Sequence, residues 1–123
     1  MLNVAVIDDD ILTLRIFKDN LEHFDYPCKT FNNYVTALKE IKKYDVVILD
    51  YHLGRVKGKD IIKDIKKERE NIFIIMISGY MIQNIINKEL KESLYSFHTK
   101  PVDFDKLKLE LDAIAISLKE ASQ

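Results

Sequence analysis

The sequence feature that most constrains the fold is an unbroken apolar run, residues 46–49, that ends on the carboxylate Asp50. Four consecutive apolar residues predict a β-strand that is buried on both faces, as in the parallel sheets of α/β proteins. A buried parallel strand delivers its last residue to the carboxyl edge of the sheet, where open α/β folds bind their ligands. Asp50 therefore occupies a position typical of functional residues, although a lone Asp after a strand also commonly caps a helix or starts a turn.

Strand patterns alternate with helix patterns along the whole chain. Further strands are predicted at residues 2–7, 26–31, 72–77 and 95–99. The second of these strands contains Pro27, which favours an edge position because proline cannot donate to a sheet ladder. Five β-α repeats connected by right-handed crossovers predict a doubly wound parallel sheet with helices on both faces.

Amphipathic helices are expected between these strands. Asp10 should cap the first helix, Asn32-Asn33 the second, which runs to about Lys43, and Asp103 the last. A loop with Gly54 and Gly58 should lead to the third helix, and the fourth should span about residues 81–92. The inward-facing apolar residues, at spacings of three and four, are Ile11, Leu14, Phe17, Leu21 and Phe24; Val35, Leu38 and Ile41; Ile61, Ile62 and Ile65; and Phe104, Leu107, Leu111, Ile114 and Leu118.

Composition and charge exclude several classes of protein. The 123 residues suffice for one domain with a genuine core, and a net charge of −1 gives no global attraction to nucleic acid or to an anionic membrane surface. No apolar run approaches the ~20 residues of a membrane helix, and the N-terminus shows no secretory signal. The single cysteine, Cys28, fits a reducing compartment, so a cytoplasmic protein is expected.

Polar residues follow four of the predicted strands. Asp8 and Asp9 follow the first, Asp50 ends the third, Ser78 follows the fourth and Lys100 follows the fifth. Carboxylates that converge at one edge repel each other, and a hard divalent cation such as Mg²⁺ resolves that repulsion. A carboxylate can accept a phosphoryl group, while a lysine and a hydroxyl contact the phosphoryl oxygens. The pattern therefore suggests an aspartyl phosphate.

A flavodoxin-type cofactor binder has the same arrangement of elements. It would need a phosphate-cradling loop after the first strand. The run Asp8-Asp9-Asp10 would repel a phosphate there unless a metal intervened, so this alternative is set aside.

Over essentially its whole length the sequence resembles the receiver domain of two-component response regulators. The resemblance rests on the strand ends Val6-Ile7-Asp8-Asp9 and Val47-Ile48-Leu49-Asp50, on Gly58, on Ile77-Ser78-Gly79 and on Lys100-Pro101. It implies a flavodoxin-like (βα)5 three-layer sandwich with a parallel five-stranded sheet in the order 2-1-3-4-5. On this interpretation residues 1–123 form one receiver domain without an output domain.

The resemblance also assigns roles at the strand ends. Asp50 is expected to be the phosphoacceptor, with Lys100 beside it. Asp8, Asp9, Asp50 and the backbone carbonyl of His52 are expected to hold Mg²⁺, with Mn²⁺ as a possible substitute. Ser78 and the aromatic Phe97 are the expected switch residues, and the peptide bond between Lys100 and Pro101 is usually cis in this family.

Several positions depart from the family pattern. Leu53-Gly54 replaces the usual Met-Pro or Leu-Pro, Ser93-Leu94 replaces a common Gly-Ala pair, and Phe97 lacks the hydroxyl of the commoner tyrosine. His52 and Tyr80 stand two residues after Asp50 and Ser78, where side chains overhang the phosphoryl group in the family. We hypothesise that these two bulky side chains shield the phosphoaspartate from water.

The last predicted helix carries a second apolar stripe, Leu109, Ala113 and Ile116, roughly opposite its core stripe. Such a helix is often a contact surface, although scattered surface apolar residues are also normal. In receivers the face of helix 4, strand 5 and helix 5 is the usual output surface. A homodimer through helices 4 and 5, or a partner site, is therefore expected here.

The sequence thus predicts a single-domain response regulator of a phosphorelay. Its expected partners are a sensor histidine kinase or a histidine phosphotransfer domain, and a downstream protein target, but neither nucleic acid nor a membrane. It would catalyse only its own phosphorylation and dephosphorylation, so it is not expected to be an enzyme with turnover. The alternative is a pseudo-receiver that binds proteins without phosphorylation. His98, in the short fifth strand, is expected to be packed rather than chemical.

Overall fold

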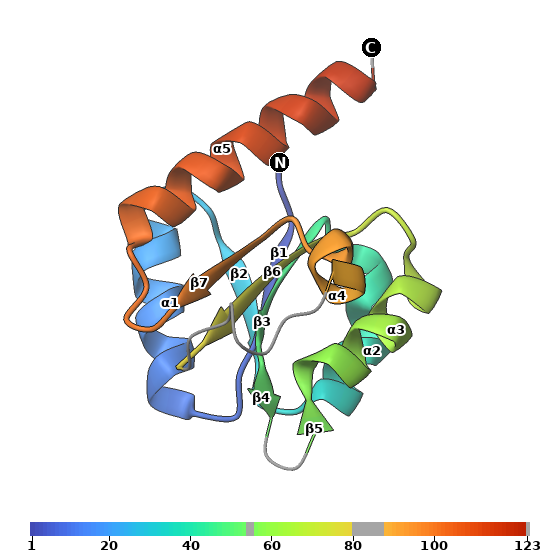
Figure 1. Cartoon of the computed structure of the whole chain (residues 1–123). Helices are drawn as coiled ribbons and strands as arrows, with labels where there is room; N and C mark the ends of the chain where they lie inside the picture. Colours follow the sequence, from blue (N-terminus) through green and yellow to red (C-terminus); the bar gives the residue numbers. More distant parts are fainter. Residues whose placement is uncertain (54–55, 80–87, 123) are drawn as a thin grey trace.

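The computed structural model describes residues 1–53, 56–79 and 88–122 (Figure 1). Its centre is a five-stranded parallel sheet in the order β2-β1-β3-β6-β7, which is the predicted order 2-1-3-4-5. The strands are β1 (Val4–Ile7), β2 (Cys28–Phe31), β3 (Val46–Asp50), β6 (Phe73–Ser78) and β7 (Ser96–Thr99). β2, which follows Pro27, lies at a sheet edge as expected.

Helices cover both faces of this sheet (Figure 1). One face carries α1 (Ile11–His23) and α5 (Phe104–Ala121). The other carries α2 (Tyr34–Glu40) with its 3₁₀ turn η1 (Ile41–Lys43), α3 (Gly58–Glu68) and α4 (Lys88–Ser93). The earlier part of the predicted fourth helix, residues 81–87, lies outside the described residues. No helix in the described segments is long and apolar enough to cross a membrane.

The core consists of two apolar layers, one on each face of the sheet. In β3, Val47 and Leu49 belong to the layer under α2 and α3, whereas Val46 and Ile48 belong to the layer under α1 and α5. Successive side chains of a strand point to opposite faces, so an unbroken apolar run fills both layers. The prediction of a strand that is buried on both faces is therefore confirmed.

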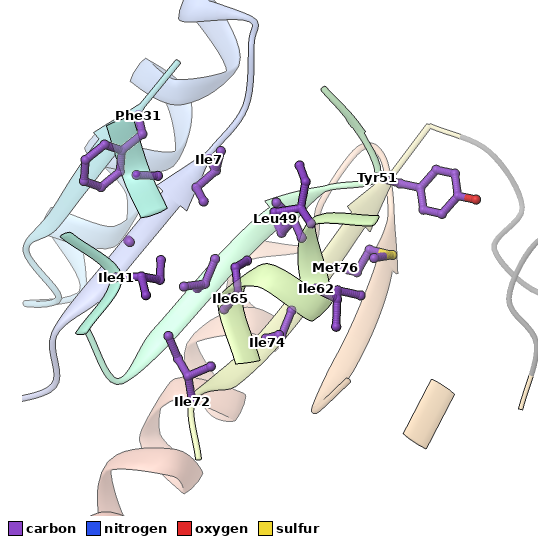
Figure 2. Packing of buried hydrophobic residues seen from close by; sticks show 14 of the residues in the cluster. Ile7, Phe31, Ile41, Leu49, Tyr51, Ile62, Ile65, Ile72, Ile74 and Met76 are labelled. Carbon is purple, nitrogen blue, oxygen red and sulfur yellow. The ribbon is translucent and has the colours of Figure 1, made fainter. Parts of the chain in front are cut away.

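Figure 2 shows the first of these layers, in which isoleucines of α3 cover the middle of the sheet. Ile62 and Ile65 lie beside Ile74 and Met76 of β6, and Ile65, Ile74 and Met76 have no exposed surface. Truncation of a buried side chain of this size typically costs 2–5 kcal/mol. This close packing holds β6, and with it the end of that strand, in a fixed position.

Three predicted helix caps are present. Side-chain oxygens of Asp10, Asn33 and Asp103 accept hydrogen bonds from backbone N–H groups in the first turns of α1, α2 and α5. A cap of this kind satisfies a donor that the helix cannot satisfy internally and stabilises the helix by about 1 kcal/mol. The caps fix where each helix begins relative to the preceding strand end.

Two residues that were predicted to face the core are exposed instead. Ile11, the first residue of α1, is 67% exposed, because it lies to one side of the helix face that buries Leu14, Phe17 and Leu21. Val35 is 49% exposed, because α2 turns Ala37 inward and a residue two positions earlier points to the opposite side.

The segment after β3 was predicted to be a loop, and this was wrong for part of it. His52–Leu53 (β4) pairs antiparallel with Val56–Lys57 (β5). Gly58 is the first residue of α3 rather than part of a loop, and Gly54 lies outside the described residues. Strands of two residues are too short to leave a periodic signal in the sequence.

Candidate functional site

The predicted polar residues converge at the carboxyl edge of the sheet. Asp8 directly follows β1, Asp50 ends β3, Ser78 ends β6 and Lys100 directly follows β7. The register of the parallel strands brings them level: Ile7 pairs with Leu49, Asp50 with Ile77, and Ser78 with Thr99. The local strand lengths and the pairing register therefore assemble a site from residues far apart in sequence.

Three carboxylates form the centre of the site. One oxygen each from Asp8, Asp9 and Asp50 lies within 4.8 Å of the others. Asp8 and Asp50 are buried, whereas Asp9 is exposed, so the cluster opens to solvent on one side. A donor set of carboxylate oxygens only, with room for water, suits a hard cation such as Mg²⁺. The residues present therefore fit a magnesium site.

Burial and mutual repulsion perturb these carboxylates. Burial, followed by the charge of Asp8, raises the pKa of Asp50 from 3.8 to about 6. Burial also raises the pKa of Asp8, although a hydrogen bond from the Asp10 backbone N–H and the charge of Lys100 act in the opposite direction. Low-pH protonation or a bound cation relieves this repulsion.

Lys100 lies between the two buried carboxylates. Its Nζ is 3.3 Å from Oδ2 of Asp8 and 3.7 Å from Oδ1 of Asp50. The backbone N–H of Lys100 donates to the carbonyl of Ser78 at 2.7 Å, which ties the lysine to the end of β6. The peptide bond from Lys100 to Pro101 is cis, as the family resemblance implies. The ammonium group is thus within reach of both buried carboxylates.

The remaining predicted residues lie around this centre. Ser78 is fully buried, and the backbone N–H of His52 donates to the Asp50 carboxylate. The His52 ring packs edge-on against the ring of Tyr51, with centroids 4.8 Å apart. Phe97 is partly buried against the layer under α2 and α3. It lies on β7, and β6 separates this strand from β3, which ends in Asp50. Tyr80 lies outside the described residues.

One polar network near the site was not predicted. His98 is buried as expected, but its Nε2 lies 2.8 Å from Oε2 of Glu110 on α5, and the Ser96 hydroxyl donates to the same oxygen at 2.8 Å. Hydrogen bonds from these two side chains lower the pKa of Glu110, although burial raises it. The network joins α5 to the strand that leads into Lys100. Its only sequence signal was a histidine in a short predicted strand, because the partner depends on how α5 lies over β7.

Comparison with known proteins identifies the family. The model of the response regulator receiver domain matches residues 4–112, so the chain belongs to this family. Receiver domains are phosphoacceptor signalling domains that bind Mg²⁺ at an acidic pocket and interact with histidine kinases or phosphotransfer proteins. The transcriptional regulatory protein ZraR of Klebsiella oxytoca is 29% identical over 111 residues, which cover 89% of this chain and 25% of that protein. The chain thus spans about a quarter of the length of this relative.

Solved structures agree with this assignment. A receiver domain protein from Clostridium thermocellum superposes with a TM-score of 0.86 at 24% identity, with all of both chains covered. The response regulator TrrA from Thermotoga maritima, solved in complex with Mg²⁺-BeF, gives a TM-score of 0.80 at 25% identity and covers 93% of this chain and 99% of its own. The predicted flavodoxin-like fold is therefore confirmed.

The raised pKa of Asp50 predicts an unusual effect of neutralising it. Its native pKa lies above the unfolded value, so the free energy of unfolding should fall as pH rises from about 4 to about 6. We expect Asp50→Asn to be about 1–3 kcal/mol more stable than the wild type at pH 7 without divalent cations. The difference in the free energy of unfolding between Asp50→Asn and the wild type should vanish at about pH 4. It should become smaller with excess Mg²⁺, because a bound cation stabilises the wild type.

Urea unfolding with a chelator at the two pH values measures this effect. Asp19→Asn is the matched control, because Asp19 is an exposed carboxylate on α1. Equal stability of the wild type and Asp50→Asn at pH 7 would show that the buried carboxylates carry no electrostatic cost.

Proposed function

We propose that this chain is a phosphorylation switch in which Asp50 accepts a phosphoryl group from a phosphohistidine. The donor would be a sensor histidine kinase or a histidine phosphotransfer domain. The observation that carries the proposal is the cluster of Asp8, Asp9 and Asp50 with Lys100 beside it, in a chain that belongs to the receiver family. TrrA, which shares this fold, was solved with Mg²⁺ and a beryllofluoride group.

The transfer itself is an in-line displacement at phosphorus. A carboxylate oxygen of Asp50 forms the new O–P bond while the N–P bond of the phosphohistidine breaks, and the imidazole leaves with the electron pair. Asp8, Asp9, Asp50 and the backbone carbonyl of His52 would hold Mg²⁺ or Mn²⁺, which neutralises phosphoryl charge when bound. At neutral pH Asp50, with its pKa of about 6, is mostly ionised and so is a competent nucleophile.

Lys100 and Ser78 would then respond to the phosphoryl group. The Lys100 ammonium, 3.7 Å from Asp50, needs only a small movement to pair with a phosphoryl oxygen. The Ser78 hydroxyl would donate to a second oxygen, and Phe97, on the neighbouring strand, would change its packing as β6 and β7 adjust. Phosphorylation would thereby shift a pre-existing equilibrium between two conformations.

The signal would leave through protein contact with a downstream target. Leu109, Ala113 and Ile116 are exposed on α5, on the side opposite the buried Leu107 and Leu111. Glu110, which lies between these two faces, is joined to β7 through His98, so α5 and the strand before Lys100 are connected. We propose this exposed stripe as the contact surface.

Phosphorylation of Asp50 can be tested with acetyl phosphate and Mg²⁺, using the intact mass of the protein as the readout. We expect a phosphoryl adduct on the wild type and on Asp64→Asn, whose carboxylate is exposed on α3. We expect none on Asp50→Asn, and none on the wild type when a chelator removes Mg²⁺. A folded wild type without an adduct, and without a response to beryllofluoride, would instead be a binding module that retains only the fold.

The lifetime of the adduct tests the proposed shielding by His52. Removal of this side chain should expose the acyl phosphate to water and speed its loss by about two- to tenfold. Intact mass followed over time measures the rate, for His52→Ala and for the double variant with Tyr80→Ala. His23→Ala is the control, because His23 is exposed on α1. An unchanged rate in the double variant would mean that neither side chain protects the phosphoaspartate.

A further inference from the structure

A pair of polar side chains ties β7 to α5 close to the point where the chain reaches Lys100. Nε2 of His98 lies 2.8 Å from Oε2 of Glu110, and the Ser96 hydroxyl donates to the same oxygen at 2.8 Å. The side chain of His98 is 6% exposed and that of Glu110 is 20% exposed. Hydrogen bonds to a carboxylate that is largely shielded from water are stronger than those at the surface. This contact therefore holds the helix firmly against the strand.

The same contact closes a loop that contains Lys100. The chain leaves β7, passes through Lys100 and residues 101–103, and begins α5 at Phe104. Pro101 has a fixed φ, and the side chain of Asp103 caps the helix, so the connecting residues have little conformational freedom. A displacement of α5 relative to β7 would therefore be passed on to Lys100.

The structure leaves space beside this loop. A pocket of about 180 Å³ separates the loop from α1, with Ile16 and Phe17 on one side and Pro101 and Val102 on the other. Protein interiors are otherwise close-packed, so such a space is where a segment can shift without a clash. The contact between β7 and α5 is thus needed to keep the loop in one position.

The position of Lys100 has opposite effects on two events at the site. Its Nζ is 3.3 Å from Oδ2 of Asp8 and 3.7 Å from Oδ1 of Asp50. Before phosphorylation, this positive charge repels a divalent cation at the same carboxylates. During phosphoryl transfer, the same charge would stabilise the phosphoryl oxygens. A displaced Lys100 should therefore favour cation binding and disfavour phosphorylation.

We propose that His98 and Glu110 are positioning residues that hold the ammonium group of Lys100 at the two buried carboxylates. They act through the backbone, by fixing α5 against β7 and with it the loop. A partner on the exposed stripe of α5 that draws Glu110 away from His98 would release Lys100, and movement of Lys100 toward a phosphoryl group would in turn loosen the pair. The inference deepens the proposed phosphorylation switch and rests on it for the role of Lys100 in the transfer.

A second polar contact of α5 provides a matched control. The Tyr26 hydroxyl donates to Asp112 of α5, and Lys108 donates to the same carboxylate at 2.7 Å. Tyr26 directly precedes the segment that leads into β2, at the opposite edge of the sheet from β7. Tyr26→Phe therefore removes a hydrogen bond to α5, as His98→Phe does, but far from the loop that contains Lys100.

The test compares the affinity for Mg²⁺ with the rate of phosphorylation. Calorimetric titration with Mg²⁺ at about pH 8, where Asp50 is ionised, gives the affinity, and intact mass after acetyl phosphate at saturating Mg²⁺ gives the rate. In His98→Phe and in Glu110→Ala, Mg²⁺ should bind about two- to fivefold more tightly. Phosphorylation of these variants should be about tenfold slower, because the counter-charge is misplaced. Tyr26→Phe should change either quantity by less than about twofold.

Conservative and milder variants separate positioning from damage to the fold. Glu110→Gln keeps a carbonyl oxygen that accepts hydrogen bonds, so both quantities should return to within about twofold of the wild type. Ser96→Ala removes one of the two hydrogen bonds to Glu110 and should give smaller changes in the same directions as Glu110→Ala. It also serves as the test variant if the larger substitutions unfold the protein. Damage to the fold would instead lower the affinity and the rate together.

The two readouts distinguish this inference from the proposed function. Changes in the variants of the pair that are no larger than in Tyr26→Phe, or a fall in affinity and rate together, would overturn the positioning role. If the wild type forms no adduct on Asp50, the phosphorylation switch fails, and the Mg²⁺ affinities still decide whether the pair positions Lys100. Tighter binding in the variants supports that role, and unchanged binding contradicts it.

Discussion

The site at the carboxyl edge of the sheet depends on the close approach of two buried carboxylates, Asp8 and Asp50. Both lie at strand ends with little exposed surface, and their mutual repulsion adds to the cost of burial that raises the pKa of Asp50 to about 6. Lys100 is near enough to both to reduce that cost but not to remove it. A cation bound by these carboxylates would relieve their repulsion and so stabilise the folded protein.

The rest of the fold keeps these charges together. Parallel pairing sets β1 and β3 level at their carboxyl ends, and the isoleucine-rich layers under the helices prevent the strands from sliding. Asp10 contributes twice: its side chain caps α1, and its backbone N–H donates to Asp8 at 2.9 Å. Apolar packing in the middle of the sheet therefore offsets the electrostatic cost of the carboxylates at its edge. This is expected where a functional site departs from optimal stability.

Much of this arrangement could be predicted from the sequence because it follows from local patterns. Apolar runs that end in Asp50 or Ser78 locate both a strand and its functional end, and the alternation of strands with helices predicts a parallel sheet. The order of the strands followed from the family resemblance. Other features depend on where elements lie in space. The exposure of Ile11 and Val35 depends on how α1 and α2 are rotated over the sheet, which periodicity does not determine. The pair between His98 and Glu110 depends on the position of α5 over β7, and no motif encodes it.

Proton release on Mg²⁺ binding tests the central claim most directly. Calorimetric titrations in buffers of different ionisation enthalpy would measure it at about pH 5.5 and about pH 8, on either side of the pKa of Asp50. If the acidic cluster binds the cation, binding at the lower pH should release most of a proton and be weaker, while binding at the higher pH should release almost none. Equal affinity at the two pH values without proton release would contradict a cation site built on Asp8 and Asp50.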